Sequence, residues 1–132
     1  MNAGTYYAKA TVAADAKHDA ATSKAAKLVI KKKAQTFCSV TSTKTLRYSA
    51  LKKSKQSFTI SATVQERAKT SYALSFVPSA AQKYVSVSSA GKVTVKKGLA
   101  KGSYAIKVRI TAGETTNYAK TTVTRTIKLV VK

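Results

Sequence analysis

Apolar and polar residues alternate along much of this sequence, and that period of two constrains the fold more than any other feature. Tyr104, Ile106, Val108 and Ile110 alternate with small or polar residues, as in a strand with one buried and one solvated face. We predict a first strand near residues 35–40, anchored by Phe37, and a short strand at Leu46/Tyr48. The same alternation predicts further strands at Tyr6/Ala8/Ala10/Val12, Leu28/Ile30, Phe58/Ile60/Ala62, Tyr72/Leu74/Phe76, Val85/Val87, Val93/Val95 and Ile127/Leu129/Val131.

Turn-forming residues separate these segments. Pro78 should end the strand that contains Phe76, because proline cannot donate to a ladder, and Gly91, Gly98 and Gly102 mark further turns. Short intervals between turns predict an all-β fold, an antiparallel sandwich of about seven strands, rather than a parallel sheet with helical crossovers. No segment has a convincing helical period. We interpret the alanine-rich stretch 13–26 as a long connection with room for a short helical turn.

Two parts of the chain about a hundred residues apart are similar. The stretches from Gly4 to Lys32 and from Gly102 to Lys132 both open with Gly-Thr/Ser-Tyr, pass through a polar loop and end in a lysine-containing apolar strand. Such a period is typical of tandem whole domains, since solenoid units have about 20–50 residues. We interpret residues 1–33 as the C-terminal hairpin of a preceding repeat and residues 34–132 as a complete module of a longer array. We expect the hairpin to be mobile or to dock on a sheet edge.

Several of these segments resemble a known family. YVSVSSAGKVTVKKG (residues 84–98), followed by GSYAIKVRITA (residues 102–112), is similar to the bacterial immunoglobulin-like repeats of Gram-positive surface proteins. The Val-x-Ser-x-Gly-x-Val hairpin of those repeats is matched by Val87, Ser89, Gly91 and Val93. The resemblance implies an immunoglobulin-like β-sandwich in an extracellular stalk or adhesin, without catalytic residues and with neighbouring repeats of the same chain as partners.

The chain is strongly basic. It has 25 Lys and Arg residues against four acidic ones, a net charge of +21, and such a field attracts nucleic acid, anionic lipid and anionic wall polymers. Twenty-one of the basic residues are lysines, which lack the bidentate fork that arginine offers to phosphate. They are spread along the polar phase of the predicted strands. We therefore expect a lysine coat on the solvent faces.

Residues with catalytic or metal-binding chemistry are few. Cys38 is the only cysteine, so no intrachain disulfide can form, and one Cys with one His cannot make a zinc cage. His18, between Asp15 and Asp19, is interpreted as a solvated loop residue rather than a general base. Asp15 and Asp19 supply too few oxygen ligands for a calcium cage. Glu66 and Glu114 fall in different loops or strand ends, which argues against a glycosidase pair. We predict no catalytic, cofactor-binding or metal-binding residues, and no enzyme.

Two alternatives remain open. Some surface modules that resemble this one join a lysine to an asparagine, and Asn117 with Glu66 or Glu114 could support such a crosslink, although Asn117 is better suited to a turn. Tyr7, Tyr84 and Tyr118 with the lysines could bind single-stranded nucleic acid, but the other tyrosines at 6, 72 and 104 lie on the core phase. A basic nucleic-acid-binding protein is therefore the alternative function.

The leading hypothesis is a structural or adhesive immunoglobulin-like module on the surface of a bacterium. It would act as a spacer and could also bind anionic cell-wall polymer or glycan through its lysines. A nucleic-acid-binding protein should gather its lysines on one face, whereas a spacer should carry them on all faces.

Overall fold

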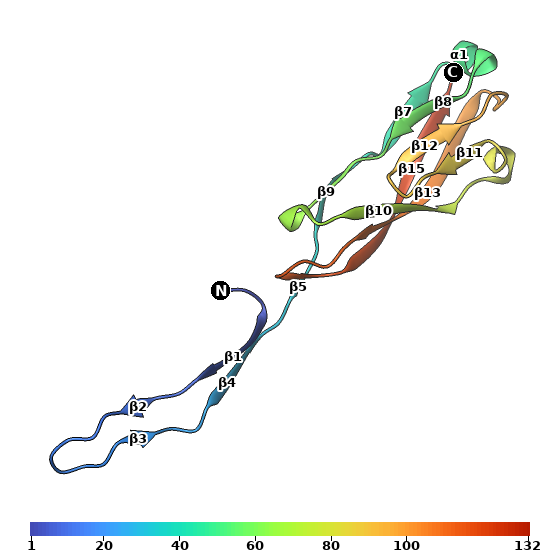
Figure 1. Ribbon diagram of the computed structural model, residues 1–132. Coiled ribbons are helices and arrows are strands. Elements are labelled where there is room, and N and C mark those ends of the chain that lie inside the picture. The colour runs from blue at the N-terminus through green and yellow to red at the C-terminus, as the bar shows by residue number, and fades with distance from the viewer.

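The computed structural model describes residues 1–132 and consists of a β-sandwich with a long hairpin extending from one end (Figure 1). The hairpin contains β1 (Gly4–Ala8), β2 (Thr11–Val12), β3 (Ala21–Thr22) and β4 (Ala26–Ile30). The sandwich contains β5 (Lys33–Ala34), β6 (Phe37–Val40), β7 (Thr43–Leu46), α1 (Tyr48–Lys53), β8 (Gln56–Thr59), β9 (Ala62–Val64), η1 (Gln65–Arg67), β10 (Thr70–Phe76), η2 (Ser79–Ala81), β11 (Val85–Val87), β12 (Lys92–Val95), β13 (Gly102–Ala112), β14 (Tyr118–Ala119) and β15 (Thr121–Val131).

The sandwich has two layers. One sheet has the order β10-β13-β15-β7 and the other has the order β11-β12-β8, while β6 pairs with β9 beyond the end of β8. β6 and β7 are two parts of the first strand of the sandwich. This strand changes sheets, because β6 pairs with β9 and β7 pairs with β15. Counting β6/β7 and β8/β9 as interrupted strands gives the seven strands of an immunoglobulin-like sandwich. The prediction of an all-β sandwich is confirmed.

Apolar side chains of the predicted phase fill the space between the sheets. On β13, every second residue from Tyr104 to Ala112 is buried, and the residues between them are exposed or partly exposed. They pack with Ile127, Leu129 and Val131 of β15 and with Phe58, Ile60, Val93 and Val95 of the facing sheet. All 25 Lys and Arg residues are exposed. Burial of one face and solvation of the other therefore follow the sequence alternation.

The structure corrects four expectations. Phe76 is 52% exposed, because the register shifts between Leu74 and Phe76 and turns the ring away from the core. Tyr48 begins α1 instead of extending a strand. The stretch 13–26, interpreted as a connection, contains the short strand β3, which pairs with β2 just before the stretch. The sandwich also contains two parallel pairs, β5–β14 and β7–β15, where antiparallel pairing was expected.

Gly91 has a steric role in the hairpin between β11 and β12. Its φ is +83°, and a Cβ there would lie 2.8 Å from the carbonyl oxygen of Ile60 and 3.0 Å from the ring of Tyr72. The carbonyl of Gly91 also accepts a 2.8 Å hydrogen bond from Ile60 N. Only glycine combines this backbone conformation with such a close approach.

The extended hairpin repeats the geometry of the β13–β15 hairpin. Gly4 pairs with Ile30 as Gly102 pairs with Val131, and Thr11 pairs with Thr22 as Thr111 pairs with Thr122. The tips share a turn, since Asp15 N donates to His18 O and Thr115 N to Tyr118 O, both at 2.9 Å.

A tyrosine hydroxyl near the start of each hairpin bonds back to the chain four residues earlier. Tyr6 donates to Asn2 O at 2.7 Å, and Tyr104 donates to Ala100 O at 3.0 Å. This is the tyrosine corner found at the start of the sixth strand of immunoglobulin-like sandwiches. The two hairpins thus share the turn and the corner, although the pairing of the first shifts by one residue between β1–β4 and β2–β3 and that of β13–β15 is continuous. In the first, however, Leu28 is 54% exposed and Val12 is 65% exposed, because no second sheet covers them.

Candidate functional site: the junction between hairpin and sandwich

The segment after β4 is held against the turn at the near end of β15. Lys33 and Ala34 form β5, which pairs in parallel with Tyr118 and Ala119 of β14. Lys33 N donates to Asn117 O at 2.9 Å. Only Lys31 and Lys32 separate β4 from β5, so the connection between the hairpin and the sandwich is short (Figure 1).

Asn117 connects three parts of the chain. Its Oδ1 accepts a 2.8 Å hydrogen bond from Ala3 N, at the base of the hairpin. Its Nδ2 donates to Glu66 Oε1 at 2.9 Å and to Asn2 Oδ1 at 3.2 Å. One amide side chain therefore joins the hairpin base, the β13–β15 turn and the turn after β9.

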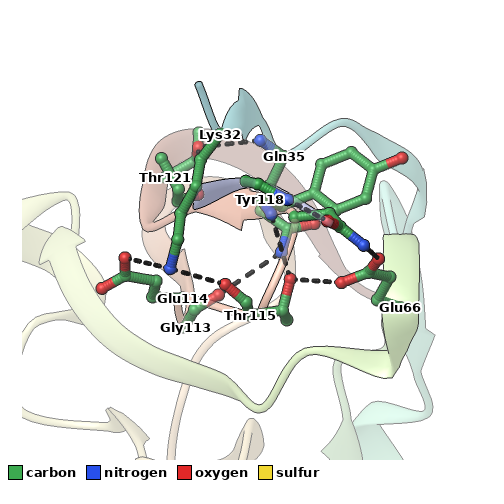
Figure 2. A network of polar contacts seen from close by, with 11 residues as sticks. Lys32, Gln35, Glu66, Gly113, Glu114, Thr115, Tyr118 and Thr121 are labelled. Carbon is green, nitrogen blue, oxygen red and sulfur yellow. Dashed lines mark hydrogen bonds and ion pairs between the residues drawn. The ribbon is translucent and has the colours of Figure 1, made fainter. Parts of the chain in front are cut away.

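Figure 2 shows Glu114 and Glu66 on opposite sides of the turn that contains Thr115. The ammonium of Lys32 bonds to Glu114 Oε1 and to Thr115 O, the second at 2.8 Å. The hydroxyl of Thr115 donates to Glu66 Oε2 and accepts from Tyr118 N at 3.2 Å. Charge-assisted hydrogen bonds of this kind are stronger than neutral ones.

Gln35 anchors the start of the sandwich. It is 5% exposed, its N donates to Thr121 Oγ1 at 3.1 Å, and its Nε2 donates to Gly113 O at 3.4 Å. Its Oε1 has no hydrogen-bond partner within the protein. The long 3.4 Å bond and the unpaired oxygen make this the weakest part of the junction.

An unusual backbone conformation presents Glu66 to this network. Glu66 and Arg67 have φ values of 51° and 49°, the left-handed region that residues other than glycine seldom occupy. Such strain persists where the surrounding contacts compensate for it. Here the carboxylate of Glu66 receives hydrogen bonds from Thr115 and Asn117.

The two glutamates of the junction are stabilised in their charged form. Hydrogen bonds from the Thr115 hydroxyl and then the Asn117 amide lower the pKa of Glu66 below its ordinary value of 4.5. The hydrogen bond and the charge of Lys32 lower the pKa of Glu114 in the same way. Protonation of either carboxylate therefore weakens the junction.

The structure separates the residues that the sequence offered for chemistry. Asn117, Glu66 and Glu114 meet at the junction, but the Lys32 ammonium binds Glu114 and the Asn117 amide binds Glu66. His18 hydrogen-bonds Asp15 at the exposed tip of the hairpin. Cys38 is exposed on β6.

Sequence reasoning did not identify the junction. The structural roles of Lys32, Gln35 and Thr115 depend on contacts between positions about 80 residues apart. The available signal was the repeat itself, because Thr115 of the second copy aligns with Asp15 at the same turn position of the first.

The basic side chains cover both sheets and the hairpin. Lys107, Arg109 and Lys128 lie on the outer face of the four-stranded sheet, where they alternate with buried residues. Lys92 of β12 is exposed on the other sheet, and Lys27 of β4 on the hairpin. The coat is therefore distributed rather than gathered on one face.

No helix is long and apolar enough to cross a membrane, and no group of three or more His, Cys, Asp or Glu side chains is placed to hold a metal ion.

Comparison with known proteins supports the fold. No protein family matches the chain, and no curated protein is detectably similar to it in sequence. Among solved structures, the chain is similar to protocadherin gamma B2 extracellular cadherin domains 3-6, with a TM-score of 0.51 and 19% identity over 74% of this chain. The match spans 22% of that protocadherin chain. This likeness is one of fold, an immunoglobulin-like β-sandwich.

Proposed function

We propose that the chain is part of a structural or adhesive array of immunoglobulin-like modules on a bacterial cell surface. Residues 34–132 would form one module, and residues 1–33 the end of the module before it. The observation that carries this proposal is the turn and the tyrosine corner that the two hairpins share, together with the junction that joins one hairpin to the other.

The pairing of the terminal strands supports a mechanical role. β7 lies near the N-terminal end of the chain segment that forms the sandwich, and β15 lies at its C-terminal end. The two strands pair in parallel, from Thr43↔Lys128 to Leu46↔Val131. Tension on the two ends pulls parallel strands past each other, so all their hydrogen bonds are loaded together. An antiparallel hairpin pulled at its open end would instead lose its pairs one at a time.

Single-molecule pulling tests this role. Handles at Ala34 and Lys132 load β7 and β15 in shear, whereas handles at Lys101 and Lys132 open the β13–β15 hairpin from its Gly102↔Val131 pair. A spacer should unfold at a clearly higher force in the first geometry. Equal forces would contradict the mechanical proposal.

The surface location and the partner need separate tests. Antibody labelling of intact cells of the source organism should equal that of permeabilised cells if the array is displayed outside, and should be absent from intact cells if it is not. The distributed lysine coat supports salt-sensitive association with anionic wall polymer or glycan. A titration with a teichoic-type polymer at increasing salt tests that association, and no salt-sensitive binding would leave the spacer role alone.

A further inference from the structure

Arg125 occupies a position that the core pattern does not explain. Arg125 lies on β15 and pairs with the buried Val108 of β13. Cross-strand partners of an antiparallel pair point to the same side of the sheet, which here is the inner side. Two residues further along, Ile127 is fully buried, yet Arg125 is exposed. A charged side chain on an inner face is costly unless the sandwich is open there.

The change of sheets by the first strand opens the sandwich at this point. β7 covers the edge of β15 only from Lys128 onward, because β6 leaves to pair with β9. The result is a cavity of about 220 Å³ lined by Phe37 to Ser42 of the departing strand and by Arg125 and Thr126. This space is open to solvent on one side and is large enough for a small anion with some of its hydration.

The guanidinium of Arg125 has no hydrogen-bond or ion-pair partner within the protein. None of the four acidic residues lines the cavity. The side-chain hydroxyls of Ser39 and Ser42 on the opposite wall are also without partners inside the protein. The cavity therefore combines the five N–H donors of a charged guanidinium with neutral hydroxyl donors. It contains no carboxylate that would repel an anion.

We propose that this cavity binds a phosphate group, with Arg125 as the bidentate anchor and Ser39 and Ser42 as additional donors. Arginine matches the geometry of phosphate oxygens through two parallel hydrogen bonds, which a lysine ammonium cannot reproduce. The coat of 21 lysines attracts any polyanion without regard to its chemistry. Arg125 supplies the chemical selectivity that the coat lacks. For a polymeric ligand, this inference rests on the proposed association with wall polymer.

Cys38 provides a reporter in the unmodified chain. It is the only thiol, it is exposed, and it lines the same cavity. The experiment measures the rate at which an uncharged alkylating reagent modifies Cys38, with and without three probes: inorganic phosphate, soluble poly(glycerol phosphate), and polyglutamate of matched charge. Each probe is titrated against the wild type, Arg125→Lys and Arg109→Lys.

The Arg109→Lys variant is a matched control, because Arg109 is a strand arginine of the same sheet on its outer face. Both variants keep the net charge. We expect poly(glycerol phosphate) to slow alkylation in the wild type and in Arg109→Lys, and Arg125→Lys to weaken the apparent affinity about tenfold by loss of the bidentate contact. Polyglutamate should not protect Cys38.

Each outcome separates the cavity from the coat. Protection by inorganic phosphate alone supports a site for free phosphate and removes the polymer association. The cavity site is overturned if poly(glycerol phosphate) protects Cys38 equally in the wild type and both variants, or if polyglutamate protects it as well as the phosphate polymer does. Binding would then be explained by the lysine coat alone. No protection by either phosphate probe also overturns it.

Discussion

The side-chain amide of Asn117 donates to Glu66 across 2.9 Å and so joins the β13–β15 turn to the left-handed turn after β9. The same side chain accepts from Ala3 N at the base of the hairpin. Asn117 therefore contributes to fixing how the preceding hairpin leaves the sandwich. The orientation of the hairpin therefore depends on this turn together with the Lys32 contacts to Glu114 and Thr115.

Replacing Asn117 with alanine should loosen the hairpin. Asn117→Ala removes three side-chain hydrogen bonds at about 0.5–1.5 kcal/mol each. We expect a wider distribution of hairpin orientations by small-angle X-ray scattering, with the melting temperature of the sandwich nearly unchanged. The neighbouring exposed Thr116 makes no side-chain hydrogen bond, so Thr116→Ala is the control. Equal scattering from both variants would contradict the role given to Asn117.

The junction should weaken in acid. The folded-state pKa values of Glu66 and Glu114 lie below the ordinary 4.5, so the charged carboxylates stabilise the junction above that pH. This contribution disappears as the pH falls from 4.5 through the lowered values. NMR line widths of the β1 and β4 amides should report the loss of order. In Glu66→Gln/Glu114→Gln the same signals should not change over this range, and an unchanged wild type would refute the prediction.

The backbone strain at Glu66 and Arg67 gives a second test of the same turn. Arg67 has a left-handed backbone conformation, and its side chain makes no contact in the network. Arg67→Gly should therefore change the unfolding free energy by less than about 1 kcal/mol, because relief of backbone strain offsets the greater freedom of the unfolded chain. Glu66→Gly relieves similar strain but removes the carboxylate, and should loosen the hairpin as Asn117→Ala does. Chemical denaturation and scattering of the two variants distinguish the roles.

Glycines 91 and 98 should differ in their response to alanine. Both have positive φ, but a Cβ at Gly91 would lie 2.8 Å from a backbone oxygen, whereas at Gly98 the nearest atom is 3.5 Å away on the Tyr84 ring. Gly98→Ala should cost about 1–2 kcal/mol for the backbone alone. Gly91→Ala adds a clash and should cost about 3 kcal/mol or more. Urea denaturation measures both, and equal costs would show that steric approach is not the reason for Gly91.

Much of the sandwich could be predicted because its alternation is long and regular. Tyr104 to Ile110 and Ile127 to Val131 occupy the buried phase that the sequence indicates. Phe76 is not buried as its phase predicts, because the register shifts within its strand. Such a shift has no signature in composition or period, so it could not be predicted. The helix that begins at Tyr48 was also not predicted. The backbone N of Tyr48 donates to Lys132 O at the other end of the chain, a contact that the local sequence does not reveal.

The junction and the cavity were harder to predict. Lys32 is one of three consecutive lysines, and nothing in that run indicates which would meet Glu114. Arg125 breaks the apolar phase of the last strand, but this break alone predicts no site, because its meaning depends on where β6 leaves the sheet. Both features arise from contacts between distant segments, which local patterns do not encode.

Residual dipolar couplings of the backbone amides test the central claim most directly, because they compare the orientation of the hairpin with that of the sandwich in the unmodified chain. If the Asn117 and Lys32 contacts hold the two parts as one body, a single alignment tensor will fit the amides of β1 and β4 together with those of β13 and β15. Hairpin couplings that collapse toward zero while the sandwich couplings remain large would show that the hairpin swings freely, and would contradict the account.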